Sequence, residues 1–228
     1  MNAKIYSNEK FIGTVELLLG DETMGGLYGE FLPTADYYSY VQKAVWKFWS
    51  AQRPDYIKWS SLNFNARLDN GYFLYAVGGF TIDDSSEFPN EPKRIDIVGV
   101  DRHVIEDFFL QPEPRPFVEE PWESITIEQK IAFESELKTE MGNYQLGFSF
   151  LGLFNFKPDN HVLADFEISA LRHDSRSDDV LFVTRKRDCE KEFAVVHLTW
   201  RGEREIDGRM PFGRREGLSQ PIKQVMGK

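Results

Sequence analysis

Apolar and polar residues alternate over several short segments of the first 110 residues, which is the pattern of half-buried β-strands. The alternation predicts strands at 4–6 and 10–19, joined by a turn at Ser7-Asn8-Glu9. It also predicts a strand at 94–100, followed by a short helix at 101–109. This half of the chain is therefore expected to consist mainly of antiparallel strands.

One segment of this half has helical periodicity instead. It follows Pro33-Thr34, and the Thr34 side chain is of the kind that caps free backbone amides at a helix start. The pattern predicts an amphipathic helix that packs on the sheet. Its apolar residues recur at helical spacing, at Tyr38, Val41, Val45, Phe48 and Trp49.

A hairpin is predicted where Asp69-Asn70-Gly71 separates the strand-like segments 61–68 and 72–77. Asn-Gly between two alternating segments is a strong signal for a two-residue hairpin turn, because both turn positions need a positive φ angle. The turn is expected at Asn70 and Gly71.

Prolines mark the clearest boundary in the chain. Four of them fall within the eleven residues of segment 111–121. Each proline lacks a backbone donor and biases the preceding residue toward extended geometry, so the segment can neither continue a helix nor lie inside a sheet. The sequence predicts an N-terminal module at 1–110, a linker at 111–121 and a C-terminal module at 122–228.

The second module begins with a predicted helix in which Thr126-Ile-Glu-Gln129 forms a capping box. Its apolar face is expected at Ile127, Ile131, Leu137 and Met141, and Gly142 is expected to end it. Strands are predicted at 162–171, 179–184 and 192–200. The fold class is therefore α+β, with two small modules, each a mostly antiparallel sheet with one main packed helix.

Composition favours a soluble globular protein, since 41% of the residues are hydrophobic and 28% are charged. No apolar stretch is long enough to span a bilayer, and the N-terminal residues lack the apolar region of a signal peptide. A single cysteine, Cys189, allows no disulfide framework within the chain. These features together predict a cytoplasmic protein.

The formal net charge of -10 narrows the class of partner. Nucleic-acid affinity comes mainly from cationic side chains that neutralise phosphates, so no nucleic-acid partner is expected. A basic protein would be attracted to such a chain. Several aromatic residues are available for a protein contact, namely Tyr37, Tyr38, Trp46, Trp49 and Trp59.

No group of residues identifies an active site, and His197 is the strongest single candidate. Alternation in 192–200 places apolar residues on both faces of its strand, so a core or half-buried histidine hydrogen-bonded across the sheet is the favoured interpretation. The alternative is a catalytic base that Asp178 or Asp179 orients.

Other chemistries lack their sequence patterns. The acidic residues Asp83, Asp84, Asp174, Asp178 and Asp179 do not have the alternate spacing of a calcium loop, and no histidine pair has zinc-site spacing. The glycine pairs lack the Lys-Ser/Thr of a phosphate-binding loop, and Gly147-Phe-Ser149 lacks the second glycine of a nucleophile elbow. No metal or cofactor site is predicted.

Two sets of motifs resemble uncharacterised bacterial protein families. One set lies in the N-terminal half, at Gly13-Thr-Val-Glu16, Met24-Gly25 and Gly29-Glu-Phe-Leu-Pro33. The other joins Asp178-Asp-Val-Leu-Phe182 to Phe193-Ala-Val-Val-His-Leu-Thr-Trp200, and the second family has Trp where Met210 stands here. The resemblance implies a bacterial, cytosolic protein. By association, it also implies one of the small proteins that accompany toxins as immunity factors.

Two functions follow as hypotheses. The first is a non-enzymatic, protein-binding module, immunity-like, that neutralises a basic toxin through an acidic, aromatic-rich face. The alternative is a small hydrolase that uses His197 with Asp178 or Asp179. A structure separates the two by showing whether His197 and an acid lie together in a concave pocket.

Overall fold

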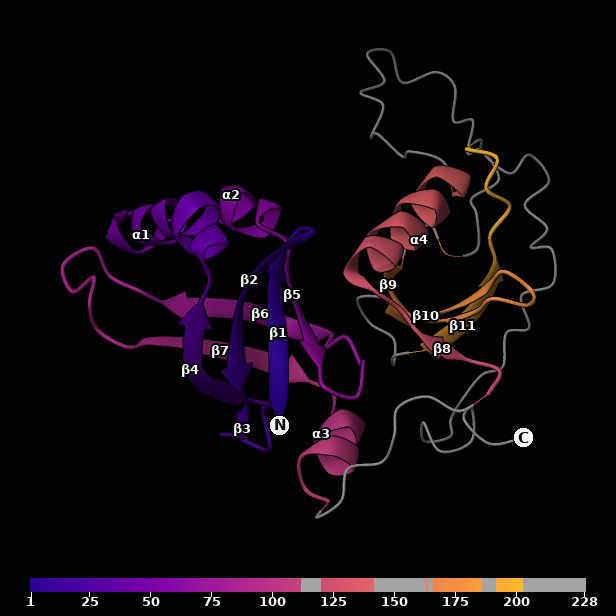
Figure 1. The fold of residues 1–228 in the computed structure, drawn as a ribbon, viewed down its shortest axis with the longest axis horizontal. Helices are drawn as coiled ribbons and strands as arrows, with labels where there is room; N and C mark the ends of the chain where they lie inside the picture. The colour runs from indigo at the N-terminus through magenta and orange to yellow at the C-terminus, as the bar shows by residue number, and fades with distance from the viewer. Residues whose placement is uncertain (112–119, 142–162, 164–165, 186–191, 203–228) are drawn as a thin grey trace, which may run out of the picture. The chain divides into compact units, whose positions relative to one another are not determined.

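The computed structural model describes residues 1–111, 120–141, 163, 166–185 and 192–202 (Figure 1). These residues form two compact units, unit 1 at 1–111 and unit 2 from 120 onward. Each unit pairs antiparallel strands and carries at least one helix, so the α+β class is confirmed. Most of the predicted linker, 112–119, lies outside the described residues.

Unit 1 is built on a seven-stranded antiparallel sheet in the order β5-β1-β2-β4-β7-β6, with β3 paired to β4. The predicted hairpin between the first two strands and the predicted strand at 94–100 are both confirmed. β6 follows no simple alternation because its glycine pair lies where the register with β7 shifts. The strands are β1 (Asn2–Ser7), β2 (Lys10–Glu16), β3 (Leu18–Leu19), β4 (Leu27–Pro33), β5 (Phe64–Leu68), β6 (Ala76–Asp83) and β7 (Lys93–Val100).

The predicted helix of unit 1 is present, but it begins with a π-helical turn, η1 (Tyr37–Val41), that runs into α1 (Gln42–Ser50). Its buried side chains are Tyr37, Val41 and Val45, spaced by four residues, while Tyr38 is exposed. A π turn takes more residues than an α turn to return to the same side. The expected position of Tyr38 on the inner face is therefore wrong, and Tyr37 packs there instead.

Thr34 does not cap this helix. Its hydroxyl donates to the Phe11 carbonyl at 2.9 Å, and so it ties the segment after β4 to β2. The residue before η1, Asp36, has no side-chain capping bond either. The expected cap is wrong because a neighbouring strand offers the hydroxyl an acceptor.

Two short helices complete unit 1. α2 (Tyr56–Ser61) has Asp55 as its N-cap, whose carboxylate accepts from the Lys58 amide at 3.1 Å. The sequence pattern had placed Ser61 in a strand, and β5 begins only at Phe64. α3 (Arg102–Phe108) confirms the predicted helix after β7.

The turn after β5 has three residues, not the predicted two. The Leu68 amide donates to the Tyr72 carbonyl at 2.8 Å, and the Gly71 amide donates to the Leu68 carbonyl at 2.8 Å. Gly71 has a φ of 92°, whereas Asn70 stays outside the left-handed region and accepts the Tyr72 amide at 3.0 Å through its side chain. This is the pattern of a type I turn closed by a glycine bulge.

Unit 2 is a four-stranded antiparallel sheet in the order β11-β10-β9-β8, with α4 (Ile127–Glu140) packed on it (Figure 1). The Thr126 hydroxyl accepts the Gln129 amide at 3.2 Å, and the Gln129 side chain accepts the Thr126 amide at 2.9 Å, so the capping box is confirmed. The predicted strands at 179–184 and 192–200 are present, although the second ends earlier. The strands are β8 (Glu123–Ser124), β9 (Glu167–Asp174), β10 (Asp179–Arg185) and β11 (Glu192–His197).

α4 buries two charged side chains that its apolar pattern does not show. Lys130 donates to the Ser169 hydroxyl at 2.8 Å and pairs with Glu134, while burial lowers the pKa of its ammonium group. Glu140 accepts the amide and the hydroxyl of Thr199, each at 2.6 Å. These contacts join α4 to β9 and to the segment after β11. The expected helix end at Gly142 lies outside the described residues.

Candidate functional site

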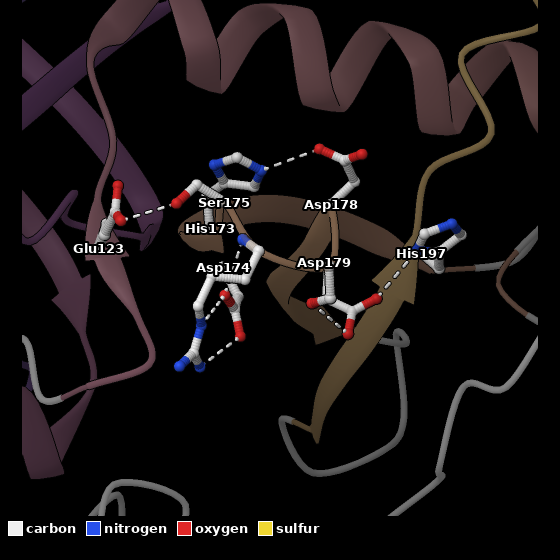
Figure 2. A network of polar contacts seen from close by, with 9 residues as sticks. Glu123, His173, Asp174, Ser175, Asp178, Asp179 and His197 are labelled. Atoms are coloured by element: carbon white, nitrogen blue, oxygen red, sulfur yellow. Dashed lines mark hydrogen bonds and ion pairs between the residues drawn. The ribbon is translucent and has the colours of Figure 1, made fainter.

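The histidine and the two aspartates singled out by the sequence lie at one end of the unit 2 sheet (Figure 2). β9 ends at Asp174, a turn follows, and β10 starts at Asp179. His197 is the last residue of β11 and is the antiparallel partner of Asp179. The sheet register therefore brings together residues that are 18 positions apart in the sequence.

His197 and Asp179 are in direct contact. Nδ1 of the imidazole lies 3.1 Å from Oδ1 of Asp179, and the Ser177 hydroxyl donates to the other carboxylate oxygen at 2.9 Å. The second ring nitrogen of His197 points away from Asp179 (Figure 2). A carboxylate on one nitrogen orients the ring and leaves the other nitrogen to exchange a proton with a ligand.

Of the two positions in the favoured interpretation, core or half-buried, His197 takes the half-buried one. Its side chain is 45% exposed, whereas its neighbours Val196 and Leu198 are buried. Alternate residues of a strand face opposite sides, and only the side of Val196 and Leu198 is covered here. The expected hydrogen bond across the sheet is present, because Asp179 provides it.

Asp178 pairs with a second histidine, His173, and not with His197. Oδ1 of Asp178 lies 3.8 Å from Nε2 of His173, an ion-pair distance longer than a hydrogen bond. The His173 ring lies 5.0 Å from the Phe133 ring of α4, so it is held on its inner side by packing. Of the two candidate acids, only Asp179 therefore orients His197.

The turn between β9 and β10 is held by its own side chains. Arg176 donates to both carboxylate oxygens of Asp174, at 3.0 and 3.1 Å, and this side-chain contact lowers the pKa of the Asp174 carboxyl. The Ser175 hydroxyl donates to Glu123 on β8 at 2.8 Å. These contacts fix the shape of the turn.

The chemistry of this site is limited by what its hydroxyl groups contact. Ser175 and Ser177 both donate to carboxylates, so neither is activated by an imidazole in this arrangement. Within the described residues, no three His, Cys, Asp or Glu side chains are placed to hold a metal ion. The His197–Asp179 pair can move a proton, and any nucleophile would have to come from water or substrate.

A second feature, in unit 1, was only partly visible in the sequence. Five aromatic rings from α1, α2 and β5 contact one another and form what we call the aromatic cluster: Phe48, Trp49, Tyr56, Trp59 and Phe64. Their ring centroids lie 4.3 to 6.5 Å apart. Trp49 is 50% exposed and Tyr56 is 69% exposed, and the adjacent Ile57 is 86% exposed. Tyr37, which the sequence offered as a surface aromatic residue, is buried instead.

The two tryptophans of the aromatic cluster are anchored to the edge of the sheet. The indole N–H of Trp49 donates to the Ile82 carbonyl at 2.7 Å, and that of Trp59 donates to the Phe80 carbonyl at 3.2 Å. Both acceptors belong to β6, which is an edge strand. The indoles therefore hold α1 and α2 against β6 and occupy two of its carbonyl groups.

Basic side chains adjoin these rings. Lys47, Arg53 and Lys58 lie beside Phe48 and Trp59, and Asp55 is the acidic residue among them. The aromatic cluster therefore adjoins a locally positive surface, although the whole chain has a net charge of -10.

Comparison of the chain with protein-family models, with curated proteins and with solved structures finds no match in any of the three. The resemblance to two uncharacterised bacterial families stays a prediction. No helix in the described part of the chain has the length and apolar content needed to cross a membrane.

Proposed function

We propose that the protein acts by binding another protein and not by catalysis. The observation that supports this is the aromatic cluster, which is partly exposed at the surface while its two tryptophans are hydrogen-bonded to β6. Trp49 is half exposed, yet its indole N–H is bonded to the sheet edge. Tryptophan and tyrosine supply much of the binding energy at protein interfaces. Rings that are already fixed lose little conformational freedom on binding.

The exposed apolar groups also favour an interface in energetic terms. Tyr56 and Ile57 are consecutive residues at the start of α2, and both are mostly exposed. Covering one such side chain stabilises a complex by about 1.5–3 kcal/mol. A single exposed apolar residue is common on protein surfaces, but a group of this kind beside a fixed aromatic cluster is typical of a binding site.

The charge of the partner is a finer part of the proposal. A basic, toxin-like protein, as in an immunity function, is supported by the net charge of -10, which would accelerate association. The surface beside the aromatic cluster is positive and would not attract a basic partner. The attraction would come from the acidic remainder of the chain. The part of any partner that contacts the cluster itself is expected to be acidic.

A small hydrolase is the second candidate function, and the His197–Asp179 contact of 3.1 Å favours it. An oriented imidazole with a free nitrogen could activate water as a general base. One observation supports the binding function over this one: the serines of the turn donate to carboxylates and not to the imidazole.

The binding function is tested by photo-crosslinking in the cell that makes the protein. A photoreactive phenylalanine analogue replaces Tyr56 in one variant and Met24 in another. Met24 is a matched control because its side chain is 63% exposed, close to the 69% of Tyr56, and it lies outside α1 and α2. We expect one discrete crosslinked protein from position 56 and none from position 24. Equal crosslinking from both positions, or none from position 56, would contradict the proposal.

A further inference from the structure

α1, α2 and the segment between them line a cavity of about 120 Å³ that is partly open to solvent and includes Phe48 and Trp59 of the aromatic cluster. Apolar side chains of Phe48, Trp59 and Leu62 line it, together with the basic side chains of Lys47, Arg53 and Lys58. It is a small apolar space with cations beside it.

The volume of the cavity limits the size of the chemical group that it can hold. Sites for cofactors and drug-sized ligands measure about 300–1,000 Å³. An apolar cavity of about 150 Å³ in another protein holds a benzene molecule. A space of about 120 Å³ therefore suits one aromatic or branched aliphatic side chain, and it is too small for a nucleotide or a flavin.

Of the three cations beside the cavity, only Lys58 pairs with a carboxylate among the described residues. Lys58 pairs with Asp55 at 3.5 Å, and the backbone amide of Lys58 helps to keep the pKa of that carboxyl low. Neither Lys47 nor Arg53 contacts a carboxylate within the described residues. Two positive charges therefore remain beside the cavity, and carboxylates are the groups that would pair with them.

We infer that the cavity receives a phenylalanine side chain from an acidic segment of a partner protein, and that carboxylates flanking the phenylalanine pair with Lys47 and Arg53. The ring would contact Phe48 and Trp59, whose own rings lie 4.3 Å apart, in the edge or offset geometry that aromatic groups prefer. This inference rests on the proposed function, because it names the kind of segment that the α1–α2 surface would bind.

The inference is tested with defined peptides and the full chain. The probe is the capped peptide Glu-Glu-Phe-Glu-Glu, titrated into isotopically labelled protein and followed by amide chemical shifts and by tryptophan fluorescence. The comparison peptides replace the phenylalanine with alanine, or all four glutamates with lysine. We expect chemical-shift changes centred on α1 and α2. We also expect an affinity at least about tenfold lower for the alanine peptide, because burial of a phenylalanine side chain contributes at least the binding free energy of a tenfold change in affinity. The lysine peptide is expected not to bind.

Protein variants separate the cavity from general electrostatics. Lys47→Glu and Arg53→Glu are each expected to lower the affinity for the probe peptide by about tenfold. Lys4→Glu makes the same change of charge on β1, at an exposed residue that does not line the cavity, and should leave the affinity unchanged. Ala44→Leu, which adds bulk to the cavity wall, should abolish binding while thermal melting shows that the fold is intact.

The outcomes distinguish this inference from the proposed function. Equal affinity of the phenylalanine and alanine peptides would overturn the inference, as would an equal loss from Lys4→Glu and Arg53→Glu. If the peptides fail to bind while position 56 still crosslinks to one protein, the inference fails and the binding function stands. If the acidic peptide binds as expected while crosslinking fails, the cavity assignment stands and the proposed function in the cell fails.

Discussion

The Tyr37 hydroxyl donates a 2.7 Å hydrogen bond to Oδ2 of Asp84, and both side chains are buried. The Gln42 side chain donates to the same oxygen at 3.0 Å, and the Lys93 ammonium lies 3.6 Å from the other. Tyr37 lies in η1 and Gln42 in α1, while Asp84 directly follows β6 and Lys93 begins β7. These contacts therefore fix η1 and α1, which carries Phe48 and Trp49 of the aromatic cluster, to the sheet.

We predict that this hydrogen bond makes the stability of the protein depend on pH in the alkaline range. Burial, followed by the Asp84 carboxylate, raises the pKa of the Tyr37 phenol far above its ordinary value. The folded state therefore keeps a proton that the unfolded state loses above pH about 10. The stability that Tyr37 contributes is complete below that pH and declines above it, by about 1.4 kcal/mol per pH unit.

The measurement is urea denaturation of wild-type protein and of Tyr37→Phe between pH 8 and pH 11. The chain has nine tyrosines, so the difference between the two proteins isolates the contribution of one. We expect that difference to shrink as the pH rises above about 10. A difference that stays constant across the range would show that Tyr37 ionises normally in the folded protein.

Lys93→Met should destabilise unit 1 strongly. The ammonium group is buried, donates to the Pro89 carbonyl at 3.1 Å and balances the charge of Asp84. Removal of one partner of a buried ion pair leaves the other charge uncompensated, which costs about 3–5 kcal/mol. Chemical denaturation measures the loss. Arg94→Met is the matched control, because its ion pair with Asp96 is at the surface and should contribute less than about 1 kcal/mol.

Short-range patterns in the sequence were enough to predict part of this fold. The capping box of Thr126 and Gln129 involves residues three positions apart, and the Asn8 turn joins adjacent strands, so local chemistry determines both. The burial of Lys130 and Glu140 could not be predicted in this way. Their partners Ser169 and Thr199 lie 39 and 59 residues further along the chain, and only the folded sheet brings them close.

At the candidate site, too, local sequence patterns do not reveal contacts between residues that are distant in the sequence. The sequence offered Asp178 or Asp179 as the partner of His197, and the antiparallel register places Asp179 beside it, whereas Asp178 pairs with His173. It did not reveal which face of β11 would be covered, since coverage depends on elements distant in the sequence. For the same reason it offered Tyr37 as a surface residue, although a π turn directs that side chain inward.

Gly71→Val is expected to destabilise unit 1 by about 1–3 kcal/mol. Gly71 has a φ of 92°, which a β-branched side chain resists, and its amide closes the turn after β5. Asp69→Val introduces the same side chain into the same turn at an exposed residue that does not have a positive φ. It should change the free energy of unfolding by less than about 0.5 kcal/mol. Equal losses from the two variants would show that bulk, and not backbone strain, is responsible.

The last prediction concerns His197, on which the choice between binding and catalysis depends. Its contact with Asp179 is partly exposed, and exposed ion pairs contribute about 0–1 kcal/mol. His197→Gln should therefore melt close to the wild type, and under the binding proposal it should also keep the crosslink from position 56. A general base behaves differently, since its removal lowers turnover by about two to four orders of magnitude while the fold is preserved. The test combines thermal melting with a broad hydrolase substrate screen of wild type, His197→Gln and His173→Gln. His173 is the control because it also lies near an aspartate, but at 3.8 Å and packed against Phe133. If wild type and His173→Gln turn over a substrate that equally stable His197→Gln does not, the hydrolase function replaces the binding function.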